Sequence, residues 1–380
     1  MHPSLHGMRP LLLTLCLTHD CTLRCRYCYA GRKYAHAMSR ETAEQGILLG
    51  LAEAERTGRG LDISYFGGEP LMEWELLQHC HEFLTSQAVQ RGIPVRSGIT
   101  TNGTLLSEDK LDWMAQRDYL IGLSLDGSPA MHDINRCRAD GAGSHAAVQA
   151  ALERLNRLPG LRSRLICVVN PANHHLLVEG VRWMHAHYRG EIILNFDYWS
   201  EWTDAQFESL SCQLTQQAAD VLVSYREGHP ILVDWVERKI RSHQQGENYC
   251  NHCRIGEQEI AVSVDGHLFP CSRMVGVGDT PEICFGHVQS GIDRAKQHYY
   301  IATRGNATPE CRLCALRRRC ANTCGCTNYA ASGAINRVSP FLCNLEQSLI
   351  RLADSLATEL YAEKNPAFMQ RFYGATTFHE

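Results

Sequence analysis

The sequence lacks any long uninterrupted apolar segment, any long basic run and any internal repeat. No segment offers the roughly 18 consecutive apolar residues of a transmembrane helix, so we expect no membrane span. Acidic and basic residues are well mixed and the net charge is −4, so nucleic acid is not an expected partner. The early run Leu11–Leu17 has a weak basic region and no small-residue cleavage site, which indicates a buried first strand rather than a signal peptide.

Cysteine is present in excess, with 18 among 380 residues. In a secreted protein this number would indicate disulfides, whereas in a reducing cytosol it indicates bound metal. Because the N-terminal segment gives no export signal, we expect a cytoplasmic protein whose thiolates bind metal.

From residue 11 to about 227, short apolar runs alternate with longer amphipathic stretches. Six such strand–helix units predict an α/β fold with a parallel sheet, either open or closed into an incomplete barrel. In both cases ligands bind at the carboxyl ends of the strands. The predicted strands are Leu11–Thr18, Leu61–Phe66, Val95–Thr101, Leu120–Leu125, Leu165–Val169 and Ile192–Phe196. The predicted helices begin after Ser39 and cover Glu73–Arg91, Ser107–Arg117, His145–Leu158, Leu177–Tyr188 and Asp204–Glu227.

Beyond about residue 235 the cysteines become dense and the predicted helices short. The runs Ile260–Val264 and His267–Phe269 flank Asp265-Gly266, which predicts a β-hairpin whose turn places Gly266 at positive φ. A last helix is expected from Leu345 to about Lys364, followed by a tail.

Cys21, Cys25 and Cys28 form a C-x3-C-x2-C loop directly after the first strand. Three thiolates on one short loop can hold three irons of a cubane cluster and leave the fourth iron open to a substrate's amino and carboxylate groups. Zinc is the alternative, but a zinc site usually needs a fourth protein ligand and paired C-x2-C knuckles.

This loop, with Tyr27 before its last cysteine, resembles the signature loop of the radical S-adenosylmethionine (SAM) superfamily. Gly67-Gly68-Glu69-Pro70 follows the second strand and resembles the family's GGEP element, which meets the methionine amino group. Two glycines permit close backbone approach, and Glu69 can accept a hydrogen bond from an ammonium.

Three further residues match positions that bind the cofactor in this superfamily. Asn102 in Thr101-Asn102-Gly103 resembles a ribose contact. Ser124, at the end of the fourth strand, and Arg136 resemble contacts of the methionine carboxylate. The four elements occur in the expected order, each after a predicted strand.

A second set of cysteines lies in the C-terminal third of the chain. Its spacings are Cys253-x12-Gly266-x4-Cys271, then Cys311-x2-Cys314-x5-Cys320-x3-Cys324, then Cys343. The pattern resembles the SPASM domain, a C-terminal extension of peptide- and protein-modifying radical enzymes. A zinc ribbon built from four of these cysteines is the alternative. The resemblance implies two interleaved ligand sets, Cys250, Cys253, Cys271 and Cys324 for one auxiliary cluster, and Cys311, Cys314, Cys320 and Cys343 for the other.

Some assignments stay open in the sequence. Cys326 can replace Cys324 as a ligand, and the upstream ligand Cys250 varies in position within the family. No histidine has a matched second ligand, so no catalytic base is assigned. The other cysteines are interpreted as buried small residues rather than ligands: Cys16, Cys80, Cys137, Cys167, Cys212 and Cys284.

The resemblance implies a partial (β/α)6 TIM-type barrel in residues 1–235, a small SPASM domain in 236–345 with a β-hairpin and short helices, and a C-terminal helix and tail in 346–380. It implies three [4Fe–4S] clusters, one of which binds SAM. It also implies a flavodoxin or ferredoxin as electron donor, and reductive cleavage of SAM to a 5′-deoxyadenosyl radical that abstracts hydrogen from the substrate.

Three substrate classes compete. The favoured one is a ribosomal precursor peptide that receives a thioether, a carbon–carbon or carbon–oxygen crosslink, or an epimerised centre. Sulfatase-maturing enzymes usually carry a Gln before the two glycines and an acidic residue after the hairpin cysteine, where this chain has Phe66 and Ser272. Oxidation of a sulfatase to formylglycine and dehydrogenation of a small molecule are the alternatives. A non-catalytic electron-transfer or zinc-binding scaffold is a further alternative, which is disfavoured because the GGEP-type elements would then have no function. With the first strand beginning near Leu11, any peptide leader is expected to bind a separate leader-peptide-binding protein or the barrel and SPASM surface.

Overall fold

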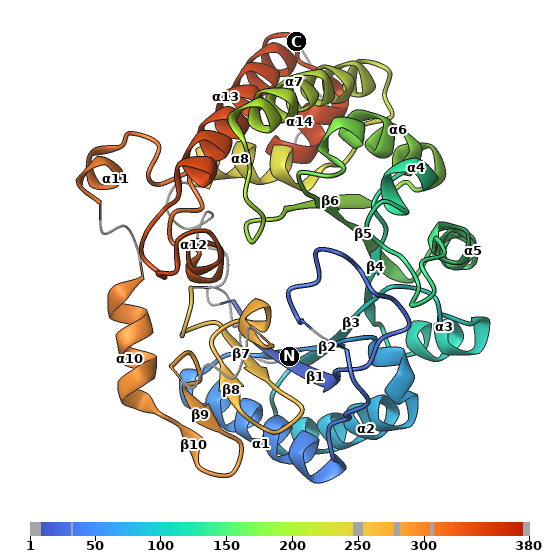
Figure 1. The fold of residues 1–380 in the computed structure, drawn as a ribbon, viewed down its shortest axis with the longest axis vertical. Coiled ribbons are helices and arrows are strands. Elements are labelled where there is room, and N and C mark those ends of the chain that lie inside the picture. The colour runs from blue at the N-terminus through green and yellow to red at the C-terminus, as the bar shows by residue number, and fades with distance from the viewer. Residues whose placement is uncertain (1–8, 32, 246–253, 277–281, 305–307, 375–380) are drawn as a thin grey trace. The chain divides into compact units, whose positions relative to one another are not determined.

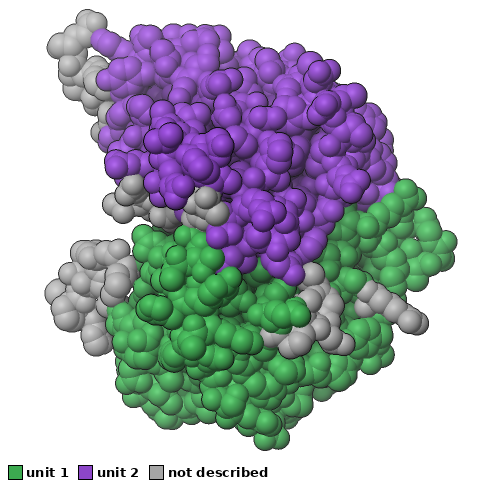
Figure 2. All heavy atoms as spheres, turned by 60° about the vertical axis from the view of Figure 1, so that its left-hand side comes forward, with its two compact units in different colours: residues 1–124, 136–163, 253–304 green, residues 125–135, 164–252, 305–380 purple. Residues whose placement is uncertain are grey.

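The computed structural model describes residues 9–31, 33–245, 254–276, 282–304 and 308–374 (Figure 1). The predicted ligands Cys250 and Cys253 therefore lie outside the described residues. The chain divides into two compact units, coloured separately in Figure 2. Unit 1 comprises Met1–Ser124, Arg136–Ser163 and Cys253–Arg304, and unit 2 comprises Leu125–Asn135, Arg164–His252 and Gly305–Glu380.

Six strands of unit 1 lie side by side in the order β4-β3-β2-β1-β7-β8. All neighbours pair in parallel except β7 and β8, which form the predicted antiparallel hairpin. The strands are β1 (Leu11–Thr18), β2 (Leu61–Gly67), β3 (Val95–Thr101), β4 (Leu120–Ser124), β7 (Glu259–Val262) and β8 (Leu268–Phe269). A two-stranded ribbon, β9 (Gly286–His287) and β10 (Gly291–Ile292), follows them.

The central position of β1 in the sheet explains why the sequence of this strand is almost continuously apolar. It pairs with β2 on one side and β7 on the other, and Leu13, Leu15 and Leu17 are fully buried. A strand covered on both faces buries every side chain, so the alternation of a half-exposed strand is lost. The register with β2 shifts between Cys16 and Thr18, next to the first cysteine loop.

Helices α1 and α2 lie side by side along the strands of unit 1 (Figure 1). Helix α1 begins after Ser39, as predicted, and Ser39 caps it because its side chain accepts a hydrogen bond from the Thr42 N–H. The α-helices of this unit are α1 (Arg40–Thr57), α2 (Trp74–Arg91), α3 (Glu108–Ala115), α5 (His145–Asn156) and α10 (Arg294–Thr303), with 3-10 turns η1 (Pro70–Glu73) and η3 (Ser272–Met274).

Unit 2 has two parallel strands and a group of long helices. β5 (Arg162–Val169) pairs with β6 (Glu191–Phe196), and α13 packs against both α7 and α8 (Figure 1). The helices are α4 (Pro129–His132), α6 (Leu177–His187), α7 (Asp204–Arg226), α8 (Asp234–Gln245), α11 (Pro309–Leu313), α12 (Gly325–Ser332), α13 (Pro340–Ala362) and α14 (Pro366–Tyr373), with the 3-10 turn η2 (His174–Leu176).

The mixed α/β fold with its parallel strands, β1 to β6 alternating with helices, is as predicted. The C-terminal prediction was wrong in two respects. The last long helix begins at Pro340 rather than Leu345, because Ser339 caps it by accepting from the Leu342 N–H and Pro340 suits its first turn. The expected tail after Lys364 contains α14, which Asn365 caps and whose Phe368 is fully buried.

Candidate functional site: the cysteine loop of unit 1

The first cysteine loop leaves β1 at Thr18, and its own backbone N–H groups donate hydrogen bonds that hold it. The Asp20 carboxylate accepts from the Cys21 N–H at 2.7 Å, and the Cys28 N–H donates to the Cys25 carbonyl at 3.1 Å. All three cysteines are half-buried and none is in a disulfide. Burial raises the pKa of the Cys21 thiol. Three cysteine thiols on one fixed loop suit a cubane cluster, whose iron charges would deprotonate them.

The two glycines of the GGEP element contact this loop directly. The Gly68 N–H donates to the Thr18 carbonyl at 2.7 Å, and the Glu69 N–H donates to the Asp20 carbonyl at 2.8 Å. A Cβ on Gly68 would lie 1.9 Å from the Asp20 oxygen, and Gly67 has a φ of 125°. Only glycine fits either position. The sequence predicted a close backbone approach at these glycines. In the structure, the segment that they approach is the start of the cysteine loop.

Glu69 connects the ends of two strands. Its carboxylate accepts from the Thr101 hydroxyl at 2.7 Å, the Asn102 N–H at 2.8 Å and the Leu71 N–H at 3.0 Å. Burial raises the pKa of Glu69, and these hydrogen bonds act in the opposite direction. Two carboxylate oxygens offer about four acceptor positions, so one is left for a further donor such as an ammonium. Pro70, which is buried, opens η1 directly after Glu69.

Asn102 is tied to the cysteine loop, which the sequence did not predict. Its side-chain N–H donates to the Thr22 hydroxyl at 3.0 Å and approaches the Cys21 sulfur at 3.5 Å. Its side-chain oxygen accepts from the Thr104 N–H at 3.0 Å. Thr22 and Thr104 also share a 2.6 Å hydrogen bond. The loop after β3 and the cysteine loop are therefore one hydrogen-bonded structure.

The segment that carries Arg136 lies against the other side of the cysteine loop. The Arg136 guanidinium is 5.4 Å from the centre of the Tyr27 ring, a cation–π distance. The Arg24 N–H donates to the Cys137 carbonyl at 2.7 Å. Arg136 is buried, and so is Ser124 at the end of β4. The structure thus brings Cys21, the GGEP element, Asn102 and Arg136 together around one loop.

Comparison with known proteins matches this region to one family. Residues 15–175 fit the sequence model of the radical SAM superfamily. This part of the chain is a radical SAM domain. A cysteine-type anaerobic sulfatase-maturating enzyme of Clostridium novyi (strain NT) is 29% identical over 160 residues, which cover 40% of this chain and 41% of the relative. The chain therefore aligns with less than half of that relative's length.

Solved structures resemble the fold over most of the chain. Native anSMEcpe, with bound AdoMet and the Cp18Cys peptide, has a TM-score of 0.75 and 17% identity, and the match covers 93% of this chain and 99% of that one. SuiB of Streptococcus suis, bound to its precursor peptide SuiA, has a TM-score of 0.61 and 16% identity, with 88% and 76% covered. At these identities the likeness concerns the fold.

Two predicted features of the cysteine-rich region lie in the same unit as the radical SAM domain's cysteine loop. Cys271 is buried and directly precedes η3. Gly266, in the hairpin turn, has a φ of 85°, and a Cβ there would lie 2.7 Å from the Val288 side chain. The predicted positive φ is confirmed, and close packing is a second reason for glycine at this position.

The remaining predicted ligands among the described residues belong to unit 2. The Cys314 N–H donates to the Cys311 carbonyl at 3.3 Å, Cys320 lies in a turn, and Cys343 is on α13. Burial raises the pKa of Cys320, and the charges of Glu346 and Cys343 add to this effect. Cys324 Sγ is 3.6 Å from Cys326 Sγ, so the structure leaves both as candidate ligands.

Among the described residues, no three His, Cys, Asp or Glu side chains form a site for a single metal ion. A cubane cluster carries a cysteine on each of several irons and so holds its thiolates farther apart than one ion does. Cysteine thiolates are the protein ligands of such clusters.

The interpretation of the other cysteines is correct for three and wrong for one. Cys16, Cys80 and Cys167 are buried, whereas Cys212 is exposed on α7. Helix periodicity turns that position to solvent while Leu210 and Leu214 face inward. Cys137 and Cys284 are half-buried.

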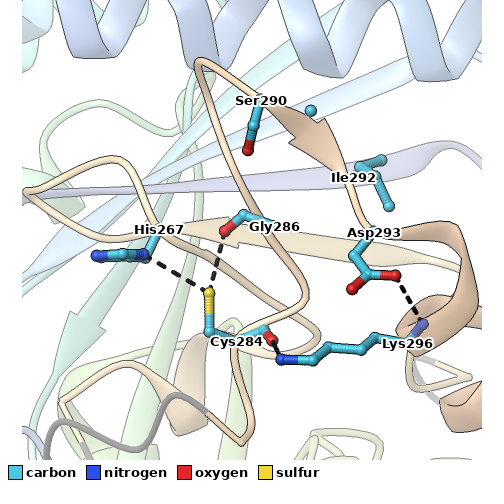
Figure 3. Close-up of a pocket in the computed structure, with 8 residues that line it drawn as sticks. His267, Cys284, Gly286, Ser290, Ile292, Asp293 and Lys296 are labelled. Carbon is cyan, nitrogen blue, oxygen red and sulfur yellow. Dashed lines mark hydrogen bonds between the residues drawn. The ribbon is translucent and has the colours of Figure 1, made fainter.

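A pocket of about 420 Å³ lies beside the β9–β10 ribbon, and none of the residues that line it is a predicted site residue (Figure 3). Cys284 Sγ is 3.7 Å from His267 Nδ1 and 3.0 Å from the Gly286 carbonyl oxygen. The Lys296 ammonium donates to the Cys284 carbonyl at 3.0 Å. No spacing pattern in the sequence indicates the Cys284–His267 contact, because the two residues lie on different turns.

No helix in the described part of the chain is long and apolar enough to cross a membrane.

Proposed function

We propose that this chain is a radical SAM enzyme that abstracts hydrogen from a ribosomal precursor peptide and thereby creates a crosslink, a thioether or an epimerised centre. The observation that carries the proposal is the junction of the cysteine loop with the GGEP element, where Gly68 and Glu69 hydrogen-bond to the backbone of Thr18 and Asp20. This junction lies at the carboxyl ends of β1 and β2, where parallel α/β sheets bind their ligands.

Cys21, Cys25 and Cys28 would hold a [4Fe–4S] cluster. When bound, this cluster supplies the electron that cleaves SAM to a 5′-deoxyadenosyl radical. Glu69 keeps an acceptor position for the methionine ammonium, and Asn102 lies beside Cys21, where it would contact the ribose. Ser124 and Arg136 would bind the methionine carboxylate, while Tyr27 supports the guanidinium of Arg136.

Two auxiliary [4Fe–4S] clusters complete the proposal. One would be held by Cys250, Cys253, Cys271 and Cys324, and the other by Cys311, Cys314, Cys320 and Cys343. The matching domain division has a barrel in residues 1–235, a SPASM domain in 236–345 and a C-terminal segment in 346–380. A cytoplasmic flavodoxin or ferredoxin would deliver the electron, and a separate protein is a candidate for binding any peptide leader.

The peptide class of substrate is supported by the two peptide-bound proteins of similar fold. Formylglycine formation in a sulfatase is the second candidate, which the likeness to the Clostridium novyi enzyme favours. Against it, Ser272 follows the hairpin cysteine where those enzymes usually carry an acid. The backbone N–H of Ser272 donates to the Glu259 carboxylate at 2.9 Å.

Anaerobic incubation with SAM, dithionite and two kinds of peptide separates these candidates. One peptide is encoded beside this gene, and the other carries a sulfatase-type Cys or Ser motif. The products are read by mass spectrometry in D2O, so that epimerisation also changes the mass. We expect modification of the neighbouring peptide only. Formylglycine in the sulfatase peptide would establish the second candidate, and unchanged peptides with active SAM cleavage would reject both.

A further inference from the structure

A buried ion pair lies between two helices of unit 2. Lys239 on α8 and Glu346 on α13 are each 5% exposed, and Lys239 Nζ is 2.6 Å from Glu346 Oε2. Burial alone would raise the pKa of Glu346, but Lys239 and the Ala321 N–H outweigh it and lower that pKa. Buried ion pairs contribute little net stability compared with apolar packing, so this pair calls for another explanation.

Both charges also hold the turn that carries Cys320. The Glu346 carboxylate accepts from the Ala321 N–H at 2.6 Å, on one side of Cys320. The Lys239 ammonium donates to the Arg319 carbonyl at 3.2 Å, on the other side. The two residues that flank Cys320 are therefore anchored by the two ends of one ion pair.

The Arg319 side chain closes the same arrangement. Its guanidinium binds Asp354 on α13 through two hydrogen bonds of 2.7 and 2.6 Å, and it donates to the Lys239 carbonyl at 3.0 Å. Helix α13 also carries Cys343, three residues before Glu346 and therefore on the same helix face. One helix thus presents Cys343 and anchors the turn of Cys320.

We propose that Lys239 and Glu346 are positioning residues that set the Cys320 turn against α13, so that Cys320 and Cys343 can ligate the same iron–sulfur cluster. This inference rests on the ligand assignment made in the proposed function. The physical reason is that directional hydrogen bonds from a buried pair fix a turn more narrowly than apolar contacts do, and residues around a metal site orient its ligands in this way.

The test separates positioning from simple core packing. In a C21A/C25A/C28A background, only auxiliary clusters bind iron, so iron and sulfide content and the dithionite-reduced EPR spectrum report on them alone. We expect K239M/E346L to remain folded by circular dichroism, because apolar residues can replace a buried pair, yet to lose about half of the bound iron. E346Q is expected to lose the same cluster.

Two controls decide the interpretation. C320A should lose the same share of iron, whereas R182M/D220L, which removes an exposed ion pair of the same unit, should lose none. The inference would be overturned if folded K239M/E346L had the same iron content and EPR spectrum as the C21A/C25A/C28A protein. It would also be overturned if K239M/E346L and E346Q both failed to fold. If C320A keeps all its iron, the ligand assignment in the proposed function has failed instead.

Discussion

The two cysteine-bearing regions of the molecule hold their thiols by different means. In unit 1 the loop of Cys21 is held by backbone hydrogen bonds to Gly68 and Glu69 and by the uncharged side chain of Asn102. In unit 2 the turn of Cys320 is fixed by the buried charges of Lys239 and Glu346. Backbone contacts depend on the absence of a side chain, whereas charged contacts depend on the presence of two particular ones. The first kind leaves a readable glycine motif in the sequence, and the second leaves none.

The largest effect that we expect comes from Gly68→Ala. The new Cβ would overlap the Asp20 carbonyl, so the junction of the GGEP element with the cysteine loop has to separate. We expect the free energy of unfolding to fall by about 3 kcal/mol and the SAM-site iron to be lost. Gly160→Ala is the matched control, since a Cβ there has no neighbour within 4 Å. Equal iron content in both variants would show that the contact is not needed.

Glu69→Gln is expected to have the next largest effect. One of the three donors that now reach the carboxylate would face an amide N–H instead of an oxygen. We expect a loss of about 1–3 kcal/mol in unfolding free energy together with weaker SAM binding, measured by chemical denaturation and equilibrium dialysis. Glu75→Gln, at an exposed position in the first turn of α2, should change neither quantity.

The acid sensitivity of unit 1 should depend on Glu53. Burial would raise its pKa, but hydrogen bonds and charges from Arg56 and Arg294 lower it to about 2. Because the folded pKa lies below the ordinary value, the unfolded chain takes up the proton first, and this stabilisation disappears as pH falls from about 4.5 towards 2. The temperature of thermal unfolding should therefore fall more steeply with decreasing pH in the wild type than in Glu53→Gln. Parallel curves would contradict the assigned pairing.

The smallest effect is expected at Cys212. Its exposed thiol on α7 should be alkylated quickly by iodoacetamide in the metal-free, reduced protein, while Cys80 and Cys167 stay protected. Cys212→Ser should change the unfolding free energy by less than about 0.5 kcal/mol. Slow alkylation of Cys212 would show that this face of α7 is covered in solution.

Much of the first site could be predicted because its parts are local in sequence. The apolar run of β1, the cysteine spacing and the glycine pair each lie within a few residues. The sequence also predicted which strand ends carry Asn102 and Ser124. It could not predict that Asn102 donates to Thr22, because two loops meet there only after the parallel strands align.

The rest of the molecule shows why local patterns were insufficient. Lys239 and Glu346 are 107 residues apart, and each alone resembles a solvent-exposed helical charge. Helix α14 begins at Pro366, directly after its cap Asn365, and its eight residues are too short for a clear amphipathic pattern in the sequence. In both cases long-range packing, rather than local propensity, determines the structure.

The most direct test of the proposed SAM site is EPR of the anaerobically reconstituted, dithionite-reduced protein, recorded with and without SAM. The variant used for it has Ala in place of Cys311, Cys314, Cys320 and Cys343. The fit of the Cys21 loop to a cluster with one open iron predicts that SAM changes the spectrum and that 5′-deoxyadenosine is released, and that Cys28→Ala abolishes both. A spectrum insensitive to SAM, with no nucleoside formed by protein that has its full iron, would contradict it.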